Sequence, residues 1–144
     1  MSGLVWMVPI TGALAILFAV YLARDVLTRD AGTPAMQEVA AMIFEGAMAF
    51  LSRQYRTIAM LAIVTAVVIG ILVGIFDSNA EEGILTAIAF LLGAFCSSVA
   101  GYIGMYISVR SNVRTASAAT RSLRDAITVA LRGGAVSGLS LIHI

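Results

Sequence analysis

The chain has 144 residues, of which 60% are hydrophobic and only 12% are charged, and its mean hydropathy is +1.00. A soluble domain carries about 25% charged residues, so the composition excludes an ordinary soluble protein and indicates an integral membrane protein. All nine basic residues are arginine. The single cysteine excludes an intrachain disulfide, and one Cys with one His offers no metal-site spacing.

Three stretches are long enough to cross a membrane as helices. Residues 4–23, 57–76 and 83–109 contain no Asp, Glu, Lys, Arg or His, and a fourth apolar stretch begins after Arg132. About 20 helical residues cross the ~30 Å hydrocarbon core, so we expect three complete transmembrane helices and a truncated fourth. The first stretch is interpreted as a retained helix and not a signal peptide, because no Lys or Arg precedes Leu4.

The arginines all fall on one side of these spans. They lie in the connections between the first and second spans and between the third and fourth spans, at Arg24, Arg29, Arg53, Arg56, Arg110, Arg114, Arg121, Arg124 and Arg132. The loop at 77–82, DSNAEE, carries three acids and no base. The positive-inside rule therefore makes the arginine side cytoplasmic and puts the N-terminus outside. No transit peptide precedes the first span, so we expect a multi-pass protein of a prokaryotic plasma (inner) membrane.

The second span is expected to continue into the cytoplasm as one long helix. After a cytoplasmic loop at 24–34, Thr33 can cap a helix and Pro34 suits its first position. Apolar residues then recur at helical spacing, at Met36, Val39, Ala40, Ile43, Ala47, Phe50 and Leu51, with a polar stripe at Glu38, Glu45 and Ser52. We predict one helix over about 35–76, roughly 60 Å long, with its apolar stripe packed on other helices. The alternative is an amphipathic helix lying flat on the bilayer.

A similar pattern predicts a fourth helix that also begins outside the bilayer. A helical stripe is formed by Ala116, Ala119, Leu123, Ile127 and Leu131. We expect a cytoplasmic turn at 110–115, a helix at 116–139, and a pairing of Arg121 with Asp125 four residues later. Small residues at four-residue spacing predict close helix contacts, at Gly70 and Gly74, at Gly93, Ser97 and Gly101, and at Gly134 and Gly138. The expected fold is therefore an all-α membrane domain, with the second and fourth helices extending into the cytoplasm.

The sequence offers no catalytic, cofactor-binding or metal-binding residue that we can name. The acids outside the spans form no D-x-x-x-D cluster, and no glycine-rich phosphate loop is present. Glu45 is expected to pair with an arginine of a neighbouring helix, or alternatively to support a cytoplasmic site. Arg110 and Arg114 lie one turn apart and repel each other unless an anion, either lipid phosphate or an acidic side chain, lies near them. Cys96 is interpreted as a small apolar helix residue. Nucleic-acid binding is not expected, because the sequence contains no basic patch with interleaved aromatic residues.

Four blocks carry a resemblance to a known family. GTPAMQEVA, EGAMAFLSRQYRTIA, GYIGMYISVRSNVRTASAA and ALRGGAVSGL resemble, in order and spacing, the N-terminal region of membrane-bound, ion-translocating pyrophosphatases. The resemblance implies a many-helix homodimer in a lipid bilayer that hydrolyses cytoplasmic pyrophosphate with Mg²⁺ and exports H⁺ or Na⁺, with a requirement for K⁺ left open.

The resemblance also implies that the active site lies outside this chain. The pyrophosphate motif of the form D-x-x-A-D-L-x-x-K is absent, so Mg²⁺ would be bound by the missing part and this chain would be inactive outer-ring scaffold. Residues that match the family motifs, Arg53, Tyr55, Arg114 and Arg132, would be scaffold residues. Two alternatives stay open at this point: a non-catalytic helical membrane subunit, or part of a secondary transporter.

The end of the chain departs from the family pattern. The final letters LSLIHI are similar to the translation of a transposon-end sequencing adapter, so we expect residues 140–144 to be non-native. His143 then has no functional meaning.

Overall fold

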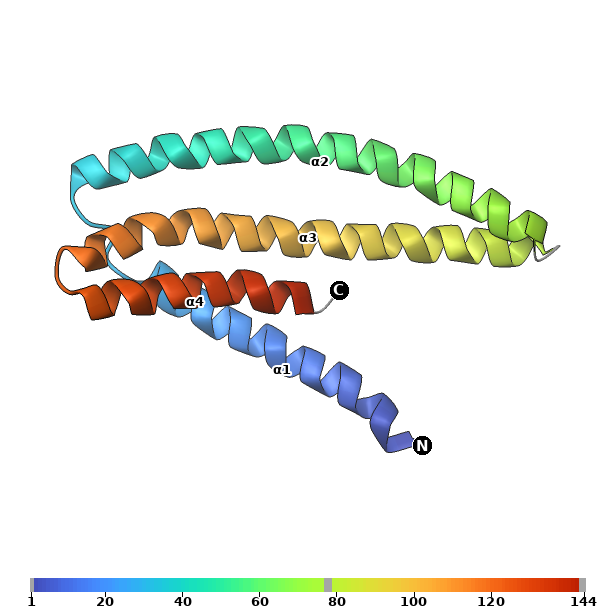
Figure 1. Cartoon of the computed structure of the whole chain (residues 1–144), viewed down its shortest axis with the longest axis horizontal. Helices are drawn as coiled ribbons and strands as arrows, with labels where there is room; N and C mark the ends of the chain where they lie inside the picture. The colour runs from blue at the N-terminus through green and yellow to red at the C-terminus, as the bar shows by residue number, and fades with distance from the viewer. Residues whose placement is uncertain (1, 77–78, 143–144) are drawn as a thin grey trace. The chain divides into compact units, whose positions relative to one another are not determined.

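The structure is a computed structural model that describes residues 2–76 and 79–142; for residues 2–5, 8 and 140–142 only the backbone is described. These ranges contain helices α1 (Ser2–Leu27), α2 (Pro34–Phe76), α3 (Ala80–Ala119) and α4 (Leu123–Ile142), and no strand (Figure 1). Among the described residues, α1, α2 and α3 are long and apolar enough to cross a membrane. The prediction of an all-α membrane fold is confirmed.

The connection between α1 and α2 follows the capping chemistry of the sequence. The hydroxyl of Thr33 accepts the backbone N–H of Met36 at 3.4 Å, and Pro34 is the first helical residue, as predicted. Just before it, Gly32 has a φ of +81°, a conformation that glycine adopts without strain. The carboxylate of Asp30 accepts the Gly32 N–H at 2.9 Å, which fixes the turn.

The predicted turn at 110–115 is wrong, and so is the predicted helix start at residue 116. Helix α3 continues through this segment to Ala119, and the chain turns at residues 120–122. The polar residues at 110–115 do not interrupt the helix, since the Ser111 hydroxyl donates to the carbonyl of Ser108 within the same helix at 2.8 Å. The true start signal is Ser122, whose hydroxyl accepts the Asp125 N–H at 3.1 Å and caps α4.

Packing divides the chain into two units, the first of which comprises residues 1–47 and 100–144. Its core lies where α1 and α4 run side by side with the C-terminal part of α3 (Figure 1). The buried apolar residues are Leu22, Val26, Ile107, Ala118, Ala126, Val129 and Val136. Small residues let α3 and α4 approach closely. A Cβ added at Gly133 would lie 2.7 Å from the Cβ of Ser111, and the Ser137 hydroxyl donates to the Gly104 carbonyl at 3.1 Å.

The second unit comprises residues 48–99 and contains one helix hairpin. Asn79 caps α3, because its side-chain oxygen accepts the Glu81 N–H at 3.1 Å while its amide donates to Glu82 at 3.1 Å. Gly83 packs directly on the backbone of Gly70 and Gly74, so that a Cβ at position 83 would overlap the Gly70 carbonyl oxygen. The predicted contact of this small-residue motif is present.

Other parts of the predicted packing surfaces are open in the described structure. An added Cβ at Gly93, Gly134 or Gly138 would meet nothing within 4 Å among the described residues. On the predicted stripe of α2, Val39 and Ile43 are 51% and 53% exposed. Their packing on other helices therefore stays a prediction.

Candidate functional site

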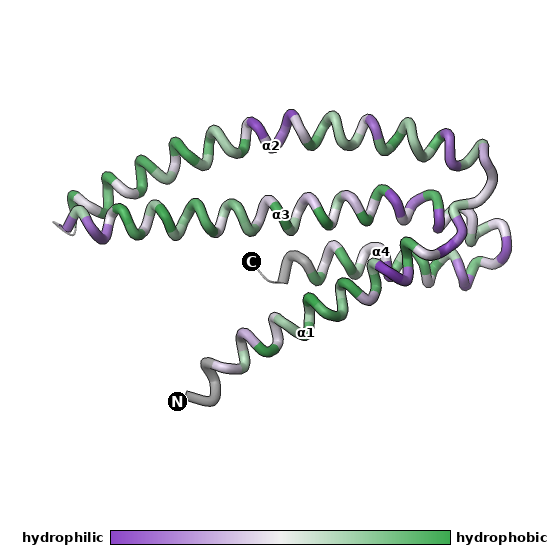
Figure 2. The backbone as a smooth tube through the Cα atoms, turned by 180° about the vertical axis from the view of Figure 1, so that it is seen from behind, coloured by the Kyte–Doolittle hydropathy of each residue, from purple (hydrophilic) through white to green (hydrophobic). Residues whose placement is uncertain are grey.

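Hydrophilic residues of the first unit gather where the α1–α2 connection meets the turn between α3 and α4 (Figure 2), and several of them form ion pairs. Asp25, near the end of α1, forms the centre of one ion-pair group. Arg132 of α4 donates to its Oδ2 at 2.7 Å, and Arg29 donates to the same oxygen at 3.1 Å from the next turn of the chain. The three side chains are about one-quarter to one-third exposed. This group fixes the end of α1 to the middle of α4.

Asp30 forms a second group in the connection. Its Oδ2 accepts from the Ser117 hydroxyl at 3.3 Å and from Arg121 Nη1 at 3.0 Å, while its Oδ1 accepts the Gly32 N–H. The pKa of Asp30 lies below its ordinary value of 3.8. The largest cause is the hydrogen bond from the Gly32 N–H; the Ser117 hydroxyl and the Arg121 guanidinium lower the pKa further, and burial raises it by less than these three lower it together. Asp30 therefore stays ionised at neutral pH and ties the connection to the end of α3.

Arg114 joins α3 to the end of α1 without an acidic partner. Its Nη2 donates to the Leu27 carbonyl at 2.9 Å and its Nη1 donates to the Arg110 carbonyl at 2.7 Å. The Leu27 carbonyl is the last of α1, where the helix dipole favours a cation. The Nε of Arg114 is buried and has no hydrogen-bond partner in the described part of the chain.

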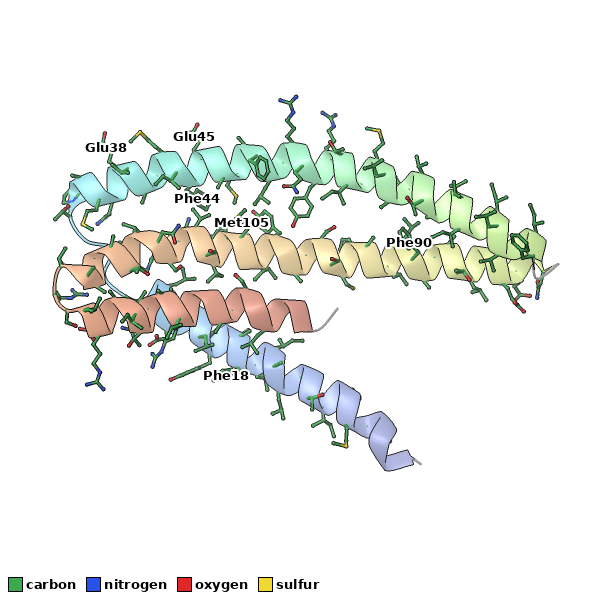
Figure 3. The ribbon with its side chains drawn as sticks, in the orientation of Figure 1. Phe18, Glu38, Phe44, Glu45, Phe90 and Met105 are labelled. Atoms are coloured by element: carbon green, nitrogen blue, oxygen red, sulfur yellow. The ribbon has the colours of Figure 1, made fainter. Side chains whose placement is uncertain are left out.

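Arg110 is held by aromatic rings instead of by acids. Its guanidinium carbon lies 4.9 Å from the centroid of Phe44 and 4.7 Å from that of Tyr106, distances typical of cation–π contacts. The two rings meet edge to face at 5.6 Å. Figure 3 shows Phe44 on the side of α2 that faces α3. This contact could not be predicted, because no local sequence signal indicates that residues 44 and 106 lie together.

A cavity of about 260 Å³ adjoins these arginines between α2 and α3. Its lining combines small and apolar residues with Gln37, Arg110 and Arg114; the complete lining is Ala31, Gln37, Ala40, Ala41, Phe44, Val109, Arg110, Val113 and Arg114. The Gln37 side-chain amide donates to the Gly32 carbonyl at 2.9 Å. No acidic side chain lines this cavity, so it is a cationic hollow within the first unit.

Two predicted ion pairs are absent from the described structure. Glu45 is exposed and points away from α3 together with Glu38 (Figure 3), and it forms no ion pair with any described residue. The pairing of Glu45 with an arginine of a neighbouring helix is not formed among the described residues and stays a prediction. Arg121 pairs with Asp30 and not with Asp125, because Arg121 lies in the turn at 120–122 and not on the same helix as Asp125.

The described residues do not suit the Mg²⁺ that the resemblance implies. Magnesium requires carboxylate oxygens that are free to bind it. The oxygens of Asp25 and Asp30 are occupied by arginines, and no group of three His, Cys, Asp or Glu residues lies together among the described residues. We therefore derive no metal chemistry from this chain.

The remaining singled-out residues lie away from the cluster or outside the described residues. Arg53 is exposed and Tyr55 is half-buried in the second unit, and Cys96 is exposed on α3. Their assignment as scaffold or apolar helix residues stays a prediction. His143 lies outside the described residues.

Comparison with known proteins decides the family. The model of the family described as "Inorganic H+ pyrophosphatase" matches residues 13–144. The chain belongs to this family. Together with the three apolar helices, membership makes the chain part of an integral membrane protein.

Relatives within the family are similar over nearly all of the chain. A protein of Moorella thermoacetica, named "K(+)-insensitive pyrophosphate-energized proton pump 2", is 50% identical over 93% of the chain and 18% of its own length. The "K(+)-insensitive pyrophosphate-energized proton pump" of Methanosarcina mazei is 44% identical over the whole chain and 20% of its own length. The "Pyrophosphate-energized membrane proton pump 3" of Arabidopsis thaliana is 38% identical over 98% of the chain and 19% of its own length.

The chain thus spans about a fifth of the length of the curated relatives that it matches. No solved structure matches it. The family match includes residues 140–144 and gives no sign that they are non-native. The expectation of a non-native tail therefore stays a prediction.

Proposed function

We propose that the whole protein is a pyrophosphate-energised proton pump that does not require K⁺, and that this chain is part of its scaffold. The similarity to the pumps of Moorella thermoacetica and Methanosarcina mazei, both named as K⁺-insensitive proton pumps, carries this proposal. It favours H⁺ over Na⁺ among the two ions left open by the sequence. Mg²⁺ and pyrophosphate would be bound by residues outside this chain, since the chain contains no motif of the form D-x-x-A-D-L-x-x-K.

Hydrolysis by membranes tests this proposal. Membranes from cells that express the full-length protein should release phosphate from pyrophosphate with Mg²⁺ present and K⁺ absent, and inside-out vesicles should acidify. The 144-residue chain alone should hydrolyse nothing. Absence of Mg²⁺-dependent hydrolysis, or transport that requires Na⁺, would contradict the proposal.

We also propose that the arginine cluster faces the cytoplasm, that the N-terminus lies outside, and that the membrane is a prokaryotic plasma membrane. The bonds from Arg132 to Asp25, from Arg121 to Asp30 and from Arg114 to Leu27 support the first part, because they require the α1–α2 connection and the α3–α4 turn to lie on the same side. The positive-inside rule then identifies that side as cytoplasmic. A homodimer in the lipid bilayer remains part of the same proposal.

The third span is proposed to end before Tyr106, short of the predicted residue 109. Phe44 lies beside Tyr106, yet the predicted spans put Phe44 about 20 Å outside a membrane helix that starts at residue 57. Both residues lie at a similar height, so Tyr106 also lies outside the hydrocarbon core.

A further inference from the structure

Four arginines of the first unit form no ion pair with a described acid, and two of them, Arg110 and Arg114, line the cavity between α2 and α3. Arg29, Arg121 and Arg132 form ion pairs with Asp25 or Asp30, whereas Arg110 and Arg114 form none with the described residues. They lie one turn apart on α3, on the same face, where like charges are unfavourable. An anion beside them would remove that repulsion.

The donors of these two side chains are only partly used. The Arg110 guanidinium lies over the rings of Phe44 and Tyr106, and its N–H groups form no hydrogen bond to any described residue. In Arg114 the two Nη atoms donate to carbonyl oxygens, while the buried Nε has no acceptor among the described residues. A buried donor without an acceptor is unusual in a folded protein and indicates a missing partner.

Both arginines line the cavity between α2 and α3, which has room for a small anion. Its volume of about 260 Å³ corresponds to roughly eight or nine water molecules at ~30 Å³ each. The rings of Phe44 and Tyr106 hold the Arg110 guanidinium, and hydrogen bonds to the carbonyls of Leu27 and Arg110 hold the Arg114 guanidinium. The cavity therefore presents two oriented guanidinium groups and no competing carboxylate.

We propose that this cavity binds a phosphate group through Arg110 and Arg114. Guanidinium forks match the geometry of phosphate oxygens, and the negative charge of the phosphate offsets the repulsion between the two arginines. The phosphate belongs either to an anionic phospholipid headgroup or to free phosphate in solution. The two sources share the same recognition chemistry and differ in what must be added to the protein.

The test uses the 144-residue chain in micelles of dodecyl maltoside, a detergent that contains no phosphate. In the first arm, inorganic phosphate is titrated at constant ionic strength, with chloride as the control anion, and the arginine Nε–H signals are followed by NMR. In the second arm, no inorganic phosphate is added and phosphatidic acid is mixed into the micelles. We expect the Arg114 Nε–H signal to shift in at least one arm, and the responding arm identifies the source.

Matched variants separate a site from general charge screening. Arg110→Gln should weaken the response about tenfold or more, as expected for the loss of a charge-assisted hydrogen-bond pair. Arg124→Gln removes an exposed, unpaired arginine of α4 and should leave the response unchanged. Circular dichroism checks that each variant keeps its helices. The hydrogen bond from Arg114 to the Leu27 carbonyl does not involve the Arg110 side chain, so Arg110→Gln keeps its donor and its acceptor.

Three outcomes would overturn the proposal. They are an Arg114 signal unchanged in both arms, equal weakening by Arg110→Gln and Arg124→Gln, and a chloride response equal to that of phosphate. An Arg110→Lys variant gives a further check, because lysine keeps the charge but cannot bind phosphate with two parallel hydrogen bonds. We expect it to bind phosphate more weakly than the wild type and more strongly than Arg110→Gln.

Discussion

The contact between α3 and α4 makes Gly133→Ala a sensitive probe of the first unit. The added Cβ would lie 2.6 Å from the Ser111 hydroxyl oxygen and 2.7 Å from the Ser111 Cβ, where ordinary contact begins at 3.4 Å. The hydroxyl can rotate away, but the Cβ of Ser111 moves only with the backbone of α3. The substitution must therefore push the two helices apart.

The neighbouring Gly134 provides the matched control, since a Cβ there meets nothing within 4 Å in the described structure. In a helix, alanine is favoured over glycine by about 1 kcal/mol, so Gly134→Ala should stabilise the fold by up to that amount. Overpacking costs about 1–3 kcal/mol, which outweighs or cancels this gain at Gly133. We expect the free energies of unfolding of the two variants to differ by about 1–3 kcal/mol.

Unfolding of the chain from mild detergent micelles by sodium dodecyl sulfate, followed by circular dichroism, measures this difference. A second substitution, Ser111→Gly, removes both overlapping atoms and should rescue Gly133→Ala, giving a favourable coupling in the double-mutant cycle. Equal stability of the two alanine variants, or an absence of coupling to Ser111, would refute the close approach of α3 and α4.

Three further substitutions probe the second unit and the charged cluster with the same titration. Gly83→Ala, whose Cβ would overlap the Gly70 carbonyl, should lower the free energy of unfolding by about 1–3 kcal/mol, whereas Gly93→Ala should not lower it; equal effects would contradict this hairpin packing. Asp25→Asn leaves two arginines without their acid and should cost about 1–2 kcal/mol at neutral pH; no loss would show that the pairs contribute nothing. Because the folded pKa of Asp30 is lowered, its contribution is complete above the ordinary value of 3.8 and is lost as pH falls through the lower folded pKa. The wild type should therefore lose part of its stability as the pH falls through the folded pKa of Asp30, and Asp30→Asn should lack this loss. An acid stability profile of Asp30→Asn identical to that of the wild type would contradict the assignment.

Local chemistry made most of the fold predictable. The long apolar runs predicted the membrane helices, and Thr33 with Pro34 predicted the start of α2. The turn between α3 and α4 was misplaced because both polar stretches contain arginine, serine and threonine, and neither contains glycine or proline. Only the cap formed by Ser122 distinguishes them, and a serine alone is a weak signal among several.

The charged cluster was less predictable, because its contacts join residues far apart in the chain. The spacing of Asp25 and Arg29 suggests a pair within one helix, but nothing local shows that Arg132 shares the same carboxylate. Glu45 is expected to pair with an arginine because it is an acid on an apolar helix. Within this chain, Phe44 and not Glu45 lies on the side of α2 that contacts Arg110 (Figure 3).

The central claim is that the arginine-bearing ends face the cytoplasm while the connection between α2 and α3 faces outside. Single cysteines at Glu81→Cys and Arg124→Cys test it with a membrane-impermeant maleimide, each in a full-length protein in which Cys96 and every other native cysteine are replaced by alanine. Both positions are exposed. We predict that intact cells label only the cysteine at position 81 and that inside-out vesicles label only the cysteine at position 124. Labelling of both positions from the same side of the membrane would contradict the sidedness and, with it, the proposed place of this chain in a pump.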